Sequence, residues 1–216
     1  MSGFRHTIAR ALTTAGFVAA LSLPLTGPAM AQSAIAAQVA KPVSLPDIAI
    51  GSAKARVTIT EYASMSCPHC AAFGENVFPM LRSRYIDTGK VRFVFREFPL
   101  DITAAASSML ARCIGKDDPE KYLAVVATLF KQLDRLMAQT KDTLKLVGKL
   151  NGMSDQEVES CEKDQVLLDK LAADQRYALD TLKVVSTPTF FVNGQKLQGA
   201  MSFEELEAII KPMLKR

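Results

Sequence analysis

The sequence predicts an α/β fold in which a strand–helix–strand unit and a strand–strand–helix unit flank an inserted all-helical block. Alternating, β-branched segments that start near residues 57 and 91 are separated by apolar residues at helical spacing, as expected for the first unit. Between residues 101 and 183 the apolar stripes have helical spacing, and strand signals return only after Pro188. The helical stretch is therefore interpreted as an insertion within one domain.

The first 31 residues have the pattern of a secretory signal peptide. Arg5 and Arg10 precede an apolar run from Ala11 to Leu25, and small residues occupy positions 29–31. This order is typical of a signal peptide, whereas the alternative, a membrane-anchoring helix, would need a longer uninterrupted apolar run. We expect cleavage after Ala31, export to the periplasm, and a flexible leader over residues 32–46.

Composition and charge favour a soluble globular protein without affinity for nucleic acid. The chain has 216 residues, of which 49% are hydrophobic, and 26 Lys and Arg against 22 Asp and Glu. Removing the signal peptide removes two arginines and leaves a net charge near +2, with no block of basic residues. We therefore expect no nucleic-acid partner. We also expect a monomer.

The first unit consists of two strands around a helix. Residues 57–62 alternate and are β-branched, which predicts a strand, and residues 91–98 predict a second strand. Apolar residues at helical spacing begin at Cys67 and continue to a stop at Gly89. Pro79 lies inside this pattern, so we expect it to kink the helix without ending it.

The helical block carries several helix-start signals. Asp118 precedes a proline, which is typical of an N-cap followed by the first helical residue. Ser154 and Glu157 have the spacing of a capping box. These signals and the apolar stripes predict consecutive helices over residues 101–183.

The last unit is predicted to be a β-hairpin followed by a helix. Residues 189–192 and 195–198 flank Asn193-Gly194, a strong signal for a two-residue hairpin turn. Ser202 and Glu205 form a second capping-box pattern before an amphipathic helix. We assign residues 47–100 and 184–216 to one discontinuous domain and residues 101–183 to the insertion.

The tetrapeptide Cys67-Pro68-His69-Cys70 lies between the first strand and its helix. A cysteine at a helix start faces unpaired backbone N–H groups and the positive end of the helix dipole, and both lower the thiol pKa. His69 can add positive charge or a hydrogen bond. A stabilised thiolate makes the corresponding disulfide a strong oxidant, so we expect Cys67 to be the attacked sulfur and Cys70 its buried partner.

Other uses of this motif fit the sequence less well. A structural zinc site needs four ligands, yet the remaining cysteines are far apart and His69 is the only histidine after the signal peptide. Covalent haem attachment needs a histidine after the second cysteine, where Ala71 stands. A purely structural disulfide between Cys67 and Cys70 remains an alternative. We expect no metal, and no cofactor beyond the redox-active cysteine pair.

Glu61 is the only carboxylate on an otherwise apolar strand face. Strand alternation places Val57, Ile59 and Glu61 on one side. Burial would raise the pKa of Glu61 and would allow it to transfer the proton of Cys70, directly or through water. The alternative is a glutamate that reaches solvent at the strand end.

Together these residues resemble the DsbA family of thioredoxin-fold proteins. The likeness rests on Glu61, the Cys67–Cys70 tetrapeptide, the helical insertion, and Thr187-Pro188 before the strand that leads to Asn193-Gly194. It covers roughly residues 45–216. The resemblance implies a thioredoxin-like fold, and the Pro-His dipeptide between the cysteines is its most specific part.

The resemblance also implies roles for residues around the cysteine pair. Pro188 would be cis and would lie against Cys67, and Thr187 would offer backbone hydrogen bonds to an extended substrate peptide. Pro68 would lie beside the same peptide. Ser186-Thr187-Pro188 differs from enterobacterial members, which often have valine before this proline, and this difference bears on substrate preference.

Cys113 and Cys161 form a second candidate pair. Each lies on an apolar helix face, and an even number of cysteines in an oxidising compartment favours pairing. Some alphaproteobacterial members of the resembled family carry a similar bridge, which supports a structural disulfide here. Two buried free thiols are the alternative.

The sequence and its resemblance lead us to expect an oxidase that introduces disulfides into unfolded or reduced exported proteins. The resemblance implies reoxidation by a DsbB-like, quinone-linked membrane protein. A disulfide isomerase or reductase would use the same Cys67–Cys70 pair, and a soft-metal-binding or chaperone-like protein would use the two sulfurs as ligands.

Overall fold

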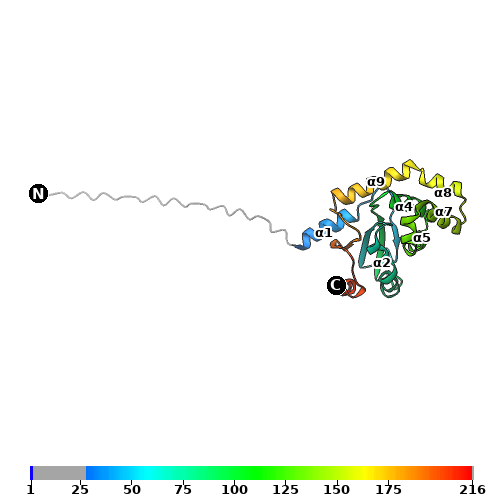
Figure 1. Ribbon diagram of the computed structural model, residues 1–216. Coiled ribbons are helices and arrows are strands. Elements are labelled where there is room, and N and C mark those ends of the chain that lie inside the picture. The colour runs from blue at the N-terminus through cyan, green and yellow to red at the C-terminus, as the bar shows by residue number, and fades with distance from the viewer. Residues whose placement is uncertain (2–27, 216) are drawn as a thin grey trace.

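The computed structural model describes Met1 and residues 28–215 (Figure 1). The predicted signal peptide lies outside the described residues except for Met1 and residues 28–31. Among the described residues, no helix has the length and apolar character that a membrane span requires.

A mixed sheet forms the centre of the molecule. Its strands follow the order β1-β3-β2-β4-β5. β2 and β3 are parallel, whereas the pairs β1–β3, β2–β4 and β4–β5 are antiparallel. The strands are β1 (Ile48–Ile50), β2 (Val57–Ala63), β3 (Val91–Glu97), β4 (Thr189–Val192) and β5 (Gln195–Gln198).

The four strands expected from the sequence are present within one residue of their predicted ends. The Asn193-Gly194 turn joins β4 and β5, and both residues have positive φ, as a hairpin turn of this type requires. β1 was not predicted, because its three residues are too few to reveal an alternating pattern.

The segment after β2 is divided near Pro79 into separate helical elements, whereas the sequence led us to expect one kinked helix. It consists of α2 (Pro68–Asn76), α3 (Phe78–Leu81) and a π-helical turn, η1 (Arg82–Ile86). Pro79 has no N–H to donate to the carbonyl of Glu75, so the hydrogen-bond ladder of α2 cannot continue through it. The break occurs at Val77.

Six helices lie between β3 and β4 along the chain, and a further helix follows β5. The side chains of Asp101, Asp118 and Asp164 cap three of these helices, and the capping boxes at Ser154 and Ser202 are both formed. The helices are α4 (Ile102–Gly115), α5 (Pro119–Lys131), α6 (Leu133–Ala138), α7 (Thr140–Leu150), α8 (Asp155–Glu162), α9 (Gln165–Asp180) and α10 (Phe203–Leu214).

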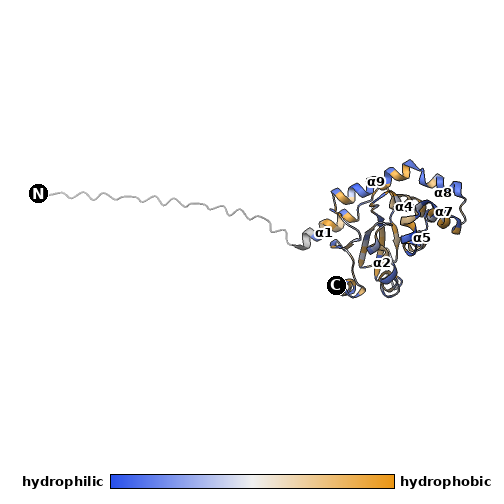
Figure 2. Ribbon diagram, viewed as in Figure 1, coloured by the Kyte–Doolittle hydropathy of each residue, from blue (hydrophilic) through white to orange (hydrophobic). Residues whose placement is uncertain are grey.

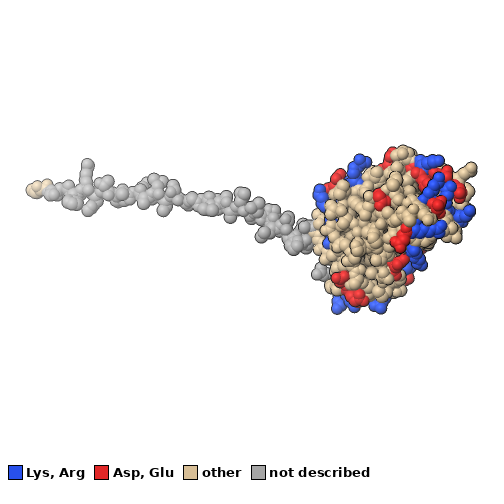
Figure 3. All heavy atoms as spheres, viewed as in Figure 1, with Lys and Arg blue, Asp and Glu red and all other residues tan. Residues whose placement is uncertain are grey.

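The helical block is amphipathic and charged on its outer side. Figure 2 shows hydrophilic residues along α8 and the outer side of α9, and Figure 3 shows acidic and basic side chains interspersed over the same end of the molecule. Lys145 of α7, for example, pairs with Asp155 and Glu159 of α8 at 3.2 and 3.1 Å. Such pairs at the surface contribute little to stability individually.

A buried ion pair joins the helical block to the sheet. Arg112 of α4 donates two hydrogen bonds to the Glu97 carboxylate at the end of β3, at 2.6 and 2.7 Å. The hydroxyl of Tyr122 in α5 donates to the same carboxylate at 2.8 Å. Because Glu97 and Tyr122 are buried, loss of any one partner would leave a buried polar group unsatisfied.

Part of the leader that we expected to be flexible is helical. α1 (Pro28–Val39) covers its first half, and Val39 is buried beside Tyr62 and Phe191. The hydroxyl of Tyr177 donates to the backbone oxygen of Gln38 at 3.0 Å. The segment shows no helical periodicity because it is nearly uniformly small and apolar, yet its alanines favour a helix.

The two faces of the sheet contact different helices. Ile59, Phe93 and Phe190 point to the face that packs on α2, α5 and α10, within the largest apolar cluster. Tyr62 and Phe191 point to the other face, where α1 and the end of α9 pack. Alternation along β2 therefore decides which residues share a side with the helix that follows it.

A disulfide crosslinks the helical block. It joins Cys113 of α4 to Cys161 of α8, with an S–S distance of 2.09 Å and a sequence separation of 48 residues. Closing a loop of this length restricts the unfolded chain, which stabilises the folded state in the chain-entropy description.

We predict that replacing both Cys113 and Cys161 with Ala lowers the free energy of unfolding by on the order of 4 kcal/mol, because the unfolded chain regains its loop entropy. Urea unfolding of variants that also carry Cys67→Ser and Cys70→Ser measures this without interference from the other pair. Adding a reductant should destabilise only the chain that retains Cys113 and Cys161. Equal stability of the two chains before reduction would contradict the prediction.

Candidate active site

Cys67 occupies the N-cap position of α2. Its backbone is extended, with φ −91° and ψ 117°, and its carbonyl accepts the first helical hydrogen bond from Ala71 at 3.1 Å. Pro68 stands at the first helical position, where its fixed φ suits a helix and its missing N–H costs nothing. The sequence therefore starts the helix directly after this sulfur, so the unpaired N–H groups of the first turn lie close to it.

The loop before β4 lies against Cys67. The peptide bond between Thr187 and Pro188 is cis, and Sγ of Cys67 donates to the carbonyl oxygen of Thr187 at 3.3 Å. The hydroxyl of Thr187 is buried and has no hydrogen-bond partner among the described residues. It can therefore donate to the sulfur once Cys67 has lost its proton.

Hydrogen bonds lower the pKa of Cys67 to about 5. The thiol of Cys70 has the largest effect, because it can donate to the Cys67 thiolate. Burial of Cys67 opposes this, whereas Thr187 and the backbone N–H groups of Cys70 and His69 lower the pKa further. At neutral pH Cys67 is consequently a thiolate in the reduced protein.

Cys70 has the opposite behaviour although it lies only one helical turn away. It is fully buried, and this burial raises its pKa above the usual range. Its hydrogen bond to Cys67 and the negative charges of Glu61 and Cys67 raise the pKa further. The pair thus holds one negative charge and one proton, with the charge on the sulfur nearer the surface.

Glu61 lies on the apolar face of β2, which is the face that packs on α2. Its side chain is buried, and burial, with a smaller contribution from the charge on Cys67, raises its pKa to about 8. Oε1 has no hydrogen-bond partner among the described residues. A cavity of about 50 Å³ lies beside it, and this volume is enough for a water molecule. Aromatic residues form much of the wall of this cavity: Phe73, Phe78, Phe93, Phe95 and Phe130.

Pro68 and His69 are exposed beside the sulfur. The imidazole of His69 makes no hydrogen bond within the described part of the chain, so its contact with the cysteine pair is through the backbone N–H alone. The sequence led us to expect either a charge or a hydrogen bond from His69. The hydrogen bond is present, but it comes from the main chain.

Ser64 is a residue of this site that the sequence did not indicate. It is buried, and its carbonyl accepts from the N–H of Cys67 at 3.1 Å. Its hydroxyl accepts from the N–H of Leu100 at 3.3 Å and lies 3.0 Å from the Ser66 hydroxyl. Ser64 thereby ties the cysteine loop to the loop after β3, and nothing in the sequence pattern distinguishes it from an ordinary loop serine.

The described residues contain no group of three or more His, Cys, Asp or Glu side chains placed to hold a metal ion. The two sulfurs of the site differ in their surroundings. Cys67, which is 5% exposed, is the sulfur that carries the negative charge, and Cys70, which is fully buried, is a thiol whose pKa the charge of Glu61 helps to raise.

Comparison with known families and sequences matches this chain to thioredoxin-like proteins and to relatives named as protein-disulfide oxidoreductases. The family model described as Thioredoxin matches residues 44–212. A Rickettsia bellii protein named as a protein-disulfide oxidoreductase is 32% identical over 155 residues, covering 71% of this chain and 59% of the relative. A Rickettsia typhi protein of similar name is 32% identical over 170 residues, covering 78% and 62%. The chain spans about three fifths of the length of these curated relatives.

Solved structures give the same result for the fold. Alpha-DsbA1 of Wolbachia pipientis matches with a TM-score of 0.75 and 29% identity, over 82% of this chain and 95% of that chain. Oxidised BdbD of Bacillus subtilis matches with a TM-score of 0.66 and 20% identity, over 79% and 94%, which shows a shared fold. The predicted thioredoxin-like fold with an inserted helical domain is confirmed.

We predict that His69→Pro raises the pKa of Cys67 by roughly one unit, because it removes a backbone N–H that donates to a charged sulfur. His69→Ala keeps this N–H and should shift the pKa much less. Ultraviolet absorbance of the thiolate, followed against pH in the reduced variants, gives both values. Equal shifts in the two variants would assign the effect to the imidazole and contradict the prediction.

A second prediction concerns the pH dependence of stability. The pKa of Glu61 is raised from 4.5 to about 8, mainly by burial, so the folded protein holds a proton that the unfolded chain loses. Stability should therefore fall as pH rises from about 4.5 to about 8, by on the order of a few kcal/mol.

The test compares the oxidised protein with its Glu61→Gln variant, because Cys67 does not titrate in the disulfide. Urea unfolding across this pH range should show a decline in the parent protein that the Gln variant lacks. Parallel pH profiles for the two proteins would indicate that Glu61 titrates normally.

Proposed function

Because the chain belongs to the thioredoxin family and lies within its DsbA-like branch, we propose that it is a thiol–disulfide oxidoreductase that introduces disulfides into other proteins. The working pair is Cys67 and Cys70. The observation that carries this proposal is the difference between the two sulfurs, since the pKa of Cys67 is lowered to about 5 whereas that of Cys70 is raised.

This difference in pKa favours electron flow from the substrate thiols to the Cys67–Cys70 disulfide. Reduction of the pair yields a Cys67 thiolate that is stable at neutral pH, and stabilising the product makes the disulfide a stronger oxidant. With a pKa of about 5, this thiolate alone makes reduction about a hundredfold more favourable at pH 7 than an unionised thiol would, or roughly 60 mV.

In the first exchange a substrate thiolate attacks Sγ of Cys67 in the enzyme disulfide. The bond between Cys67 and Cys70 breaks, and a mixed disulfide between substrate and Cys67 forms. Cys70 leaves with the electron pair and takes up a proton, because burial disfavours its thiolate. Protonated Glu61, or water beside it, supplies that proton.

In the second exchange another substrate thiolate attacks the substrate sulfur of the mixed disulfide. Cys67 leaves as a thiolate, which its helix position and neighbours stabilise. The substrate has then lost two electrons and gained a disulfide, and the enzyme holds a Cys67 thiolate and a Cys70 thiol. In this proposal an extended substrate chain passes the sulfur beside Thr187, whose carbonyl oxygen lies 3.3 Å from Sγ of Cys67, and beside Pro188 and the exposed Pro68.

The compartment and partners follow from the same proposal. An oxidase of this kind works on unfolded or reduced proteins after export, and we place it in the periplasm, behind the signal peptide inferred from the sequence. Return of the pair to the disulfide requires an acceptor for two electrons, and we propose a DsbB-like, quinone-linked membrane protein for this step.

The reduction potential of the Cys67–Cys70 pair is the decisive measurement. We predict a value above about −200 mV, more oxidising than the glutaredoxin range, measured by equilibration with glutathione after metal analysis of the same sample. A value near about −270 mV would indicate a reductase. Stoichiometric copper or zinc bound to the pair would indicate a metal-binding protein.

Two cysteine variants separate the roles of the sulfurs. Cys67→Ser should abolish oxidation of a reduced test protein, because the buried Cys70 cannot be reached by a substrate. Cys70→Ser should retain a reactive Cys67 and accumulate a mixed disulfide with a disulfide-containing peptide. Oxidase activity in the Cys67→Ser variant would exclude its assigned role.

A further inference from the structure

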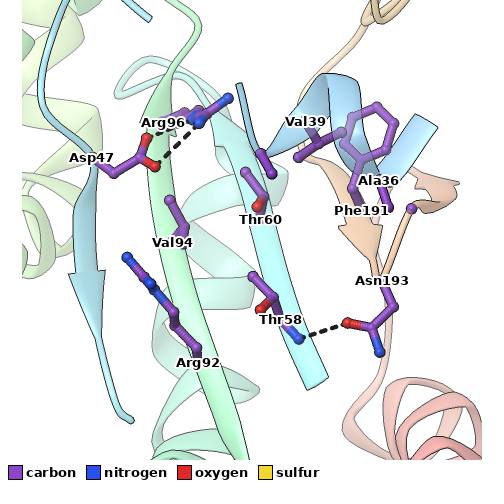
Figure 4. Close-up of a pocket in the computed structure, with 12 residues that line it drawn as sticks. Ala36, Val39, Asp47, Thr58, Thr60, Arg92, Val94, Arg96, Phe191 and Asn193 are labelled. Carbon is purple, nitrogen blue, oxygen red and sulfur yellow. Dashed lines mark hydrogen bonds and ion pairs between the residues drawn. The ribbon is translucent and has the colours of Figure 1, made fainter. Parts of the chain in front are cut away.

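A cavity of about 310 Å³ lies on the sheet face opposite α2, away from the cysteine pair (Figure 4). Thr58 and Thr60 of β2 and Val94 of β3 form its floor. Thr58 and Thr60 alternate with Ile59 and Glu61 along β2, and Val94 lies between Phe93 and Phe95 on β3, so all three point away from the buried core that supports α2. The redox chemistry proposed above makes no use of this cavity.

One wall of the cavity carries a cation without a partner. Arg92 of β3 is half-buried, and its guanidinium forms no hydrogen bond or ion pair among the described residues. The hydroxyls of Thr58 and Thr60 likewise have no hydrogen bond from the described part of the chain. Figure 4 shows the Arg92 side chain directed toward the β1 side of the sheet and the two threonines on β2, so the guanidinium is the donor available to an acidic group and the hydroxyls add polarity to the floor.

The other charged residues at the cavity neutralise each other. Arg96 donates two hydrogen bonds to the Asp47 carboxylate, at 2.7 and 3.1 Å, and a third to the hydroxyl of Tyr62 at 2.8 Å. Figure 4 shows this ion pair at one end of the cavity, with Arg92 on the same side of the sheet. The charge of Arg92 is therefore the uncompensated one among the residues that line the cavity.

The opposite wall is apolar. Phe191 of β4 and Ala36 and Val39 of α1 form it, and Figure 4 shows them across the sheet from Arg92. Gly194 allows α1 to lie close, because a side-chain carbon at this position would collide with the backbone oxygen of Gln32. The cavity thus has a cationic side and an apolar side, separated by a floor with two hydroxyls.

We propose that this cavity binds a small amphipathic carboxylate. The carboxylate would accept two hydrogen bonds from the planar guanidinium of Arg92, a geometry that this side chain favours, and the ligand would cross the floor formed by Thr58, Thr60 and Val94. The apolar body would lie against Val39 and Phe191. The volume of the cavity suits a ligand of modest size.

Octanoate serves as the probe, and octanol, which has the same apolar body without the acid, serves as its control. We expect octanoate to bind the oxidised protein saturably in calorimetry, and Arg92→Gln to weaken it by about tenfold or more, as loss of a hydrogen bond between charged groups would. Arg92→Lys should recover part of the affinity. Lys131→Gln removes the same charge from α5, on the other sheet face, and should leave binding unchanged.

Val94→Phe provides an independent steric test, since it should fill the floor and reduce octanoate binding while Arg92 remains. Circular dichroism and the reactivity of Cys67 establish that each variant is folded. Equal binding of octanoate and octanol, or equal loss in Arg92→Gln and Lys131→Gln, would overturn the proposal. If the Arg92→Gln variant keeps the redox potential of the parent protein, its loss of octanoate binding is separate from the function of the cysteine pair.

Discussion

The chemistry of this molecule depends on where the negative charge lies within the cysteine pair. Cys67 and Cys70 are three residues apart, yet one faces backbone donors at a helix start and the other is enclosed by apolar side chains. A uniform environment would give two similar thiols and a weak oxidant. The fold creates the asymmetry by ending β2 at Ala63, turning at Ser64, and starting α2 immediately after Cys67.

In the proposed mechanism, Glu61 supplies the proton that Cys70 needs. A carboxylic acid with a pKa of about 8 holds a proton at neutral pH beside a sulfur that needs one whenever the disulfide opens. The same burial makes Glu61 a destabilising choice for the folded protein, since a buried and unpaired acid costs free energy. A residue of this kind on an otherwise apolar strand face is therefore better explained by function than by packing.

The parts of the structure that could be predicted from the sequence are those set by local patterns. Alternation along β2 placed Glu61 on the buried face, and Asn193-Gly194 identified the hairpin. The missed parts depend on contacts distant in sequence. The hydroxyl of Ser64 accepts a hydrogen bond from Leu100, which is distant in sequence. Contacts with Tyr177 and with the β4–β5 hairpin hold α1 in place. Local sequence patterns reveal neither set of contacts.

The order of elements along the chain has a consequence for when the enzyme becomes competent. β2 and β3 are adjacent in both sequence and space, but β4, which pairs with the other side of β2, follows only after the six inserted helices. Thr187, which contacts Cys67, comes 120 residues after it. A growing chain that emerges from its N-terminus therefore carries both cysteines long before it carries the strand that completes their surroundings. Until that part of the chain is present, Cys67 lacks its hydrogen bond to the carbonyl oxygen of Thr187.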